Sequence, residues 1–212
     1  MAPYRIRLTY SKTGAIRYTG HLDLYRVWER AIRRSHLPVA FSNGFHPLVR
    51  MAMACALPLG FTSQGELIDL WLVDPMDPAD VVAGLSPALP PGLSLLHAEM
   101  VEPGERSLQT RVRSSRYQVT LLDPVEPGWL AGQVEQVLSS PKIERVWRDK
   151  PYDLRPYIEA LECLPADLQG HPCLSMRLAA REGATGRPEE VLSALGCDPA
   201  LARVERLELI LA

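Results

Sequence analysis

The 212-residue sequence predicts an α+β protein made of two consecutive halves. Three observations carry this prediction: strand-like alternation of apolar residues, helix-like spacing of apolar residues, and a polar segment near the middle of the chain. Each half follows the order β-α-β-β-α-β, which is the order of a ferredoxin-like fold. The predicted division is residues 1–102 for the first half, 103–115 for a linker and 116–212 for the second half.

The first half opens with an alternating strand over residues 4–10, in which Arg5 and Arg7 face away from Ile6 and Leu8. A helix follows over residues 21–36, and its apolar residues share one arc: Leu24, Val27, Trp28, Ala31 and Ile32. The remaining elements of this half are strands over 51–61 and 65–74, a helix over 77–89 and a strand over 93–101.

The second half repeats the order with one additional extended piece. Strands are predicted over 116–123, 142–148, 173–181 and 202–212, extended chain over 152–164, and helices over 127–141 and 187–195. Sequence identity between the halves is not apparent, so the proposed duplication depends on element order alone.

Positive charge is concentrated at the start of the chain. Residues 1–50 hold nine Lys and Arg against two acids, a net charge of +7, whereas the whole chain carries −2 and the remainder therefore −9. Four arginines lie opposite the apolar arc of the first helix: Arg26, Arg30, Arg33 and Arg34. This pattern favours a basic surface for an anionic partner, although a solvated helix face would have the same pattern.

The segment SNGFHP, residues 42–47, follows the basic helix and has the composition of a structured loop. Ser42, Asn43 and Gly44 form turns, Gly44 permits a positive φ, and their backbone N–H groups suit an anion-binding concavity. Phe45 is expected to anchor the loop in the core, with stacking on a base as the alternative. His46 and Arg50 would then face a ligand, so the loop and the helix together form a candidate phosphate or RNA site.

Two histidines allow a catalytic alternative. His21 and Asp23 are two residues apart and point about 200° apart on a helix, so the pair does not form a metal site. With His46 from the loop the three groups could bind a metal or move a proton. In the catalytic case Arg17 or Arg34 could stabilise developing charge. The simpler expectation is that His21 helps to begin the helix and Asp23 complements its dipole.

Two further clusters lie in the second half. Basic and aromatic residues interleave in RDKPYDLRPYI, namely Arg148, Lys150, Tyr152, Arg155 and Tyr157. Such interleaving is typical of nucleic-acid surfaces, and also of an edge strand protected by charge. The segment REGATGRPEE leads two glycines into a helix, where ordinary helix entry is the expected role.

Cysteines and hydropathy limit the function classes. Cys55, Cys163, Cys173 and Cys197 form no CxxC pair, so neither a zinc ribbon nor an iron–sulfur cluster has a local ligand set, and we expect no cofactor. No apolar run reaches the roughly 18 residues that a membrane span needs, and no signal peptide precedes Tyr4. A cytoplasmic protein with free, mostly buried thiols is expected.

Several separated motifs resemble those of the radical-SAM-linked family DUF2344. The run GAIRYTGHLD is similar to the family pattern G-x-[LI]-[RK]-[FY]-x-[SG]-H-x-[DE], and SNGFHP to S-x-G-[FY]-[NH]-P. The segments ALPLGFTSQGELIDLWL, YDLRPYI and GRPEEVLSAL also agree. The chain departs from the family after Pro47, where further polar or basic residues are common and only Arg50 remains.

The resemblance implies a partner, since family members stand beside or are fused to a cobalamin-binding radical-SAM enzyme. A radical-SAM enzyme needs three clustered cysteines, which this chain lacks, so it is expected to assist such an enzyme. Three functions remain open at this point. They are a module that binds RNA or another anionic substrate, a protein-docking module without nucleic acid, and a metal-independent RNA endonuclease that uses His21 and His46.

Overall fold

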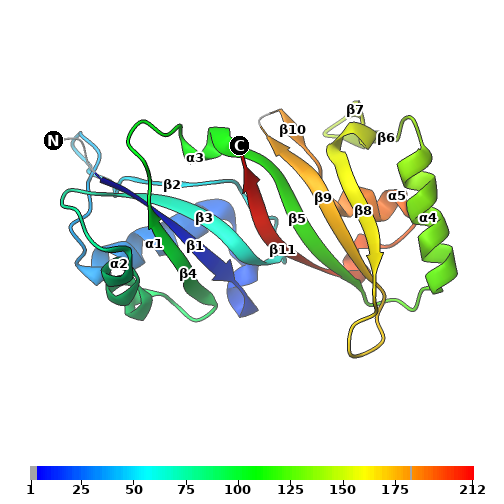
Figure 1. The fold of residues 1–212 in the computed structure, drawn as a ribbon, viewed down its shortest axis with the longest axis horizontal. Coiled ribbons are helices and arrows are strands. Elements are labelled where there is room, and N and C mark those ends of the chain that lie inside the picture. Colours follow the sequence, from blue (N-terminus) through cyan, green and yellow to red (C-terminus); the bar gives the residue numbers. More distant parts are fainter. Residues whose placement is uncertain (1–3, 182) are drawn as a thin grey trace. The chain divides into compact units, whose positions relative to one another are not determined.

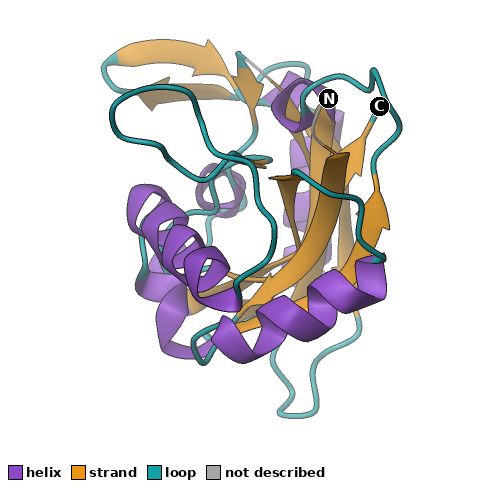
Figure 2. Cartoon of the chain, turned by 90° about the vertical axis from the view of Figure 1, so that its left-hand side faces the viewer, coloured by secondary structure: helices purple, strands orange, loops and turns teal. Residues whose placement is uncertain are grey.

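A computed structural model describes residues 4–181 and 183–212, apart from the side chain of Pro127. Helices and strands both build the fold, in purple and orange in Figure 2, so the predicted α+β class is confirmed. The chain forms two compact units, Met1–Val112 (unit 1) and Arg113–Ala212 (unit 2). None of the helices in the described part of the chain has both the length and the apolar character needed to cross a lipid bilayer.

The sheet of unit 1 has the order β4-β1-β3-β2, and each neighbouring pair is antiparallel (Figure 1). Its strands are β1 (Tyr4–Lys12), β2 (Met51–Met53), β3 (Thr62–Leu72) and β4 (Leu93–Met100). The strand predicted over residues 51–61 is shorter than expected, because the chain bends at Ala54 and Cys55. Pro58 and Gly60, at a φ of 83°, then lead it through a turn.

Helices α1 (His21–Ser35) and α2 (Pro78–Leu85) pack on the apolar face of this sheet. The predicted apolar arc of α1 is confirmed, because Leu24, Trp28, Ala31 and Ile32 are buried and Val27 is half-buried. The indole of Trp28 meets the ring of Tyr10 edge to face, with 4.8 Å between ring centroids. Asp77 begins α2 by accepting a hydrogen bond from the N–H of Ala79. Short 3₁₀ turns, η1 (Gly14–Tyr18) and η2 (Ser86–Ala88), complete this layer.

The segment predicted as a linker, 103–115, is not featureless. It contains the short helix α3 (Leu108–Arg111) and the beginning of β5 (Val112–Leu121). Leu108 is buried, and the side-chain amide of Gln109 donates a hydrogen bond to the carbonyl of Met53. Most of this segment is therefore attached to unit 1.

The sheet of unit 2 has the order β8-β9-β5-β11, and β10 pairs with the end of β9. The strands are β5, β8 (Ile158–Leu164), β9 (Cys173–Arg181), β10 (Ala184–Thr185) and β11 (Ala202–Leu211). Helices α4 (Pro127–Ser139) and α5 (Pro188–Ala194) lie at the predicted positions, and η4 (Pro199–Leu201) precedes β11.

A separate hairpin of β6 (Glu144–Trp147) and β7 (Lys150–Asp153) accounts for the additional piece of this unit. The extended chain predicted over residues 152–164 was wrong in its middle, where the 3₁₀ turn η3 (Arg155–Tyr157) separates β7 from β8. Pro156 lacks a backbone N–H and favours this turn. The two turn residues of the hairpin, Arg148 and Asp149, have φ values of 49° and 62°. Left-handed conformations at both positions are those of a type I′ turn.

Candidate functional site

The positive charge of residues 1–50 is partly buried and partly paired. Arg7 and Lys12 are buried, at 4% and 1% exposure, and Lys12 donates a hydrogen bond to the carbonyl of Thr19. On α1, Arg26 pairs with Asp23 at 3.0 Å, and Arg34 donates to the carbonyl of Ala88. The basic face that the sequence predicted therefore has fewer available cations than its charge count indicates.

Arg30, on the same helix, differs from these paired arginines. Its side chain is exposed and makes no hydrogen bond or ion pair with any residue in the described ranges. It lies one turn before Arg34 and three residues before Arg33, on the surface of α1 that carries the other arginines. Its guanidinium is therefore available to an anion.

The SNGFHP loop is closed at its base and held on α1. An isolated bridge pairs Phe41 with Val49, the N–H of Ser42 donates to the carbonyl of Leu48, and the N–H of Leu48 donates to the Ser42 hydroxyl. Arg33 then fixes the loop to the helix. Its guanidinium donates to the carbonyl of Pro47 at 3.1 Å, stacks on the ring of Phe41 at 5.2 Å and pairs with Glu29 at 2.9 Å.

The tip of this loop points to solvent. The prediction that Phe45 anchors the loop in the core was wrong, because its side chain is fully exposed at 102%. The anchoring contacts come instead from Arg33 and Phe41. Gly44 has a φ of 136°, a positive value as the sequence indicated, and this conformation turns the chain immediately before Phe45. Asn43 and His46 are exposed beside Phe45.

His21 lies far along α1 from the loop that carries His46. His21 begins α1, whereas the loop that carries His46 is held by Arg33, twelve positions later on the same helix. At 1.5 Å per residue these positions are roughly 18 Å apart along the helix axis. An acid and a base that act on one bond must reach it within hydrogen-bond distance, so the structure gives no support to a joint role for His21 and His46.

The other two predicted cations of unit 1 stack on aromatic rings. The guanidinium of Arg17 lies 4.8 Å from the ring centroid of Tyr18 and donates to its hydroxyl. Arg50 and Arg5 both stack on Trp71, at 5.0 and 5.9 Å. Arg5, Arg50 and Trp71, with Tyr4 and the chain from Met100 to Glu105, line a pocket of about 520 Å³.

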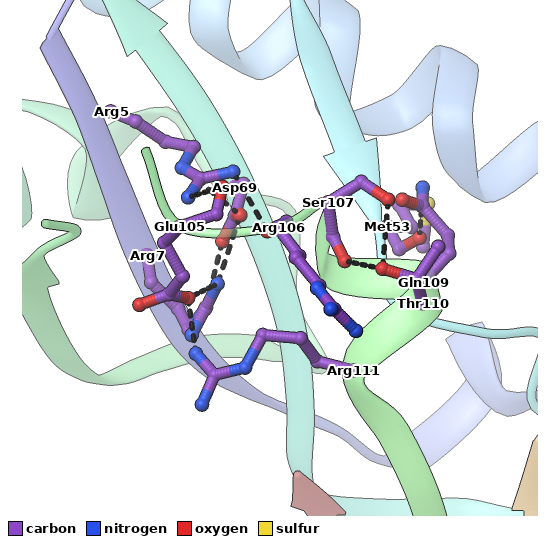
Figure 3. A network of polar contacts seen from close by, with 10 residues as sticks. All are labelled: Arg5, Arg7, Met53, Asp69, Glu105, Arg106, Ser107, Gln109, Thr110 and Arg111. Atoms are coloured by element: carbon purple, nitrogen blue, oxygen red, sulfur yellow. Dashed lines mark hydrogen bonds and ion pairs between the residues drawn. The ribbon is translucent and has the colours of Figure 1, made fainter. Parts of the chain in front are cut away.

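Arg5 and Glu105 of this pocket also belong to a cluster of charged residues that the sequence did not predict (Figure 3). Arg7 lies directly opposite Asp69 on β3, and its guanidinium donates to both carboxylate oxygens, at 2.8 and 3.0 Å. Glu105 pairs with Arg7 at 2.9 Å and also with Arg111. The one signal in the sequence was Asp69 itself, a carboxylate within an apolar strand, which burial permits only when the charge is paired.

Arg5 attaches the returning chain to the same place. Its guanidinium lies 3.7 Å from the Asp69 carboxylate and donates hydrogen bonds to the carbonyls of Glu105 and Arg106. The carboxylate of Asp69 is completely buried. This cluster of Arg5, Arg7, Asp69, Glu105 and Arg111, called the ion cluster below, fixes residues 105–111 to the polar face of the sheet.

Acid is expected to weaken the ion cluster through Glu105. Burial raises the pKa of Glu105, but the hydrogen bonds and charges of Arg111 and Arg7 outweigh burial and lower the pKa below its ordinary value. A carboxyl group whose pKa falls on folding stabilises the protein above its unfolded pKa, about 4.3, and this stabilisation is lost as pH falls through the folded pKa. Urea unfolding of the wild type and Glu105→Gln should therefore differ clearly at pH 7 and converge as the pH falls below about 4.

The matched control for this pH experiment is Glu99→Gln. Glu99 is an exposed carboxylate on β4, and its ion pair with His97, at 3.9 Å, joins two exposed side chains and so contributes little. This variant should follow the wild type at every pH. If the difference between wild type and Glu105→Gln were the same at pH 7 and pH 3, the carboxylate of Glu105 would not be the titrating group.

In unit 2 the structure brings two sequence clusters together. Lys150, Tyr152 and Tyr157 of the basic and aromatic cluster line a pocket of about 330 Å³ with Trp147. The glycine-containing segment adds Gly183, Thr185 and Arg187 to the lining of this pocket. The sequence separated these clusters by about thirty residues, and β10 and the start of α5 return the second cluster to the first.

Arg155 belongs to this sequence cluster but not to the pocket. Its guanidinium donates hydrogen bonds to the carbonyl of Leu138, at 3.2 and 3.0 Å, and to that of Ile158 at 3.0 Å. The assignment of Arg155 as a ligand-binding residue finds no support in these contacts. It instead satisfies the Leu138 carbonyl near the end of α4 and the Ile158 carbonyl at the start of β8.

The cysteines are free thiols, but only Cys173 is buried, so the prediction of mostly buried thiols was wrong. Cys163 is exposed, and Cys55 and Cys197 are half-buried. Burial raises the pKa of both Cys163 and Cys197, which disfavours the reactive thiolate. Within residues 4–181 and 183–212, no three His, Cys, Asp or Glu side chains are grouped so that they could hold a metal ion.

Comparison with known proteins gives one strong match. The family model described as "Uncharacterized protein conserved in bacteria (DUF2344)" matches residues 5–188. No curated protein matches the sequence. Among solved structures, the crystal structure of a candidate glycine cleavage system transcriptional repressor is similar over 99% of this chain and 98% of that chain, with 11% identity and a TM-score of 0.25. A likeness at this level indicates neither fold nor function.

Proposed function

The chain belongs to the DUF2344 family, and we propose that it is a non-catalytic accessory protein that binds single-stranded RNA through α1 and the SNGFHP loop. One observation carries the proposal: the fully exposed ring of Phe45 stands at the tip of a loop that Arg33 holds on the basic helix. An exposed aromatic ring on a loop held by a basic helix suits base stacking together with phosphate contact, because every base has a π-face. Arg30 supplies an available cation on the same helix.

We further propose a cobalamin-binding radical-SAM enzyme as the partner of this protein in the cytoplasm. The motif resemblance to a radical-SAM-linked family supports this partner class. The protein would present the RNA, and the enzyme would perform the chemistry. Co-purification of the two proteins without RNA, with unchanged affinity after nuclease treatment, would instead favour a docking module.

Each unit is, in this proposal, a ferredoxin-like half. Two sheet orders support it: β4-β1-β3-β2 in unit 1 and β11-β5-β9-β8 in unit 2. If the β6–β7 hairpin and β10 are treated as insertions, the four remaining strands of unit 2 are β5, β8, β9 and β11. In each unit the first of four strands then lies between the third and the fourth, as in a β-α-β-β-α-β fold.

Replacement of Phe45 by alanine should weaken the binding of a short single-stranded RNA. Loss of one stacking contact is expected to cost about 1–3 kcal/mol of binding free energy. Fluorescence anisotropy with a labelled oligonucleotide measures this change.

Replacement of Arg30 by glutamine should reduce the affinity for RNA. It should also lower the slope of log K against log salt by about 0.7, the value for one phosphate contact on a single strand.

Leu168→Ala is the matched control for the Phe45 experiment. Leu168 is a large apolar side chain with 109% exposure in unit 2, so its removal changes exposed apolar surface without touching the loop. RNA affinity equal in wild type and Phe45→Ala, with Leu168→Ala also unchanged, would remove the SNGFHP loop from the proposed interface.

A further inference from the structure

The pocket of unit 2 combines flat aromatic surfaces with positive charge. Its lining includes Trp147, Tyr152 and Tyr157 and the cations Lys150 and Arg187, and no acidic residue lines it among the described residues. Its volume of about 330 Å³ lies at the small end of the range for small-molecule sites, roughly 300–1,000 Å³. A pocket of this size suits one small planar anion rather than a long polymer.

The aromatic rings are held in fixed positions. The guanidinium of Arg187 stacks on Trp147, with 3.7 Å between its central carbon and the ring centroid. Tyr152 and Tyr157 stack with their centroids 6.0 Å apart and an interplanar angle of 27°. Because these side chains already contact one another, a ligand that stacks on them orders little additional side-chain freedom.

Tyr152, one of the lining residues, has a poorly satisfied hydroxyl. The hydroxyl is buried, and its hydrogen bond with Arg187 has poor geometry. Burial, and then the charge of Glu190, raise the pKa of Tyr152, while Arg187 and Arg145 act in the opposite direction. The hydroxyl therefore stays protonated near neutral pH and can donate a hydrogen bond. A buried hydroxyl with a poor hydrogen bond costs free energy, part of which a bound acceptor would recover.

Close backbone packing fixes the wall of the pocket. A Cβ atom on Gly186 would lie 3.0 Å from the carbonyl oxygen of Tyr157 and 3.0 Å from Cβ of Leu178. A side chain at position 186 would therefore push Tyr157 or Leu178 away by a few tenths of an ångström. Glycine at this position suits the close approach of the segment that carries Thr185 and Arg187 to Tyr157.

We propose that this pocket binds one nucleoside monophosphate unit, with the base against the aromatic side chains and the phosphate at Lys150 and Arg187. Stacking on aromatic rings or on a guanidinium plane accepts any base, and paired cations neutralise the phosphate. The unit could be a free nucleotide or one residue of the RNA in the proposed function. The inference rests on the proposed function only if the bound unit is a residue of RNA, and not if it is a free nucleotide.

Calorimetric titration of the full chain tests the pocket directly, with adenosine monophosphate, uridine monophosphate and inorganic phosphate as separate ligands. We expect saturable binding of both nucleotides and at least about tenfold weaker binding of phosphate alone, because stacking is lost. Lys150→Gln and Arg187→Gln should each weaken nucleotide binding about tenfold, the effect of losing one charge-assisted hydrogen bond. Arg203→Gln removes an exposed arginine of unit 2 outside the pocket and should change affinity less than twofold.

A second arm uses Phe45→Ala and a trinucleotide, so that the two proposals fail independently. Nucleotide binding that persists in Phe45→Ala supports the pocket whatever happens to the loop, and tighter trinucleotide binding through Lys150 identifies RNA as the source. The inference is overturned if no nucleotide saturates the protein at millimolar concentration. Equal affinities for phosphate and nucleotides, or equal effects of Lys150→Gln and Arg203→Gln, would also overturn it. Tyr152→Phe keeps the ring and removes only the hydroxyl. It therefore tests the pocket even if Arg187→Gln folds poorly.

Discussion

Replacement of Asp69 by alanine should lower the free energy of unfolding of the protein by about 3–5 kcal/mol, the usual cost of leaving a buried charge without its partner. Asp69 is completely buried and accepts two hydrogen bonds from Arg7, which is itself 4% exposed. Without the carboxylate, the guanidinium of Arg7 keeps only Glu105 as an ionic partner within the ion cluster. Urea or thermal unfolding followed by circular dichroism measures the loss.

Asp23→Ala provides the comparison for Asp69→Ala. Asp23 also pairs with an arginine, Arg26, but both side chains are about two-thirds exposed, at 67% and 70%. An exposed pair of this kind contributes roughly 0–1 kcal/mol. Equal destabilisation by the two variants would mean that burial does not set the strength of the Asp69 contact.

Replacement of Gly92 by alanine is expected to be the second large effect, with a loss of about 2–5 kcal/mol. Gly92 has a φ of 92°, and an L-residue in a left-handed conformation costs about 1–2 kcal/mol. A Cβ atom there would also lie 2.5 Å from the carbonyl oxygen of Thr13 and 2.9 Å from a methyl group of Ile16. Such overpacking adds about 1–3 kcal/mol.

Gly104→Ala separates these two contributions. Gly104 has a similar φ of 85°, but no atom lies within 4 Å of the position that its Cβ would take. Its replacement should cost only the free energy of a left-handed backbone conformation. The difference in stability between the two variants then measures the clash at Thr13. If both glycine variants unfolded at the same urea concentration, the turn at Gly92 would have relaxed to accept the methyl group.

The sequence predicted those elements whose residues interact locally. The helix with Leu24 and Trp28 on one side lies where the apolar spacing placed it, because burial of one helix face sets that spacing. The alternation of Ile6 and Leu8 with Arg5 and Arg7 likewise identified β1 and its two faces.

Contacts between distant segments were not predictable in this way. The roles of Glu105 and Arg111 depend on where the chain returns after β4, and the polar composition of residues 103–115 suggested only a linker. Phe45 was placed in the core because it is apolar, but burial depends on what surrounds a loop. The pocket of unit 2 needed β10 to bring Arg187 to Trp147, a contact across forty residues that no local pattern encodes.

The ion cluster gives the two faces of the unit 1 sheet different responses to temperature. Hydration of charged groups becomes less favourable on heating, so the desolvation cost of burying Arg7 and Asp69 falls. The hydrophobic contribution of the opposite face, which includes Ile6 and Leu8, reaches a plateau instead. On cooling, the apolar face weakens as well. The charged face therefore contributes a growing share of the stability of this sheet as the temperature rises.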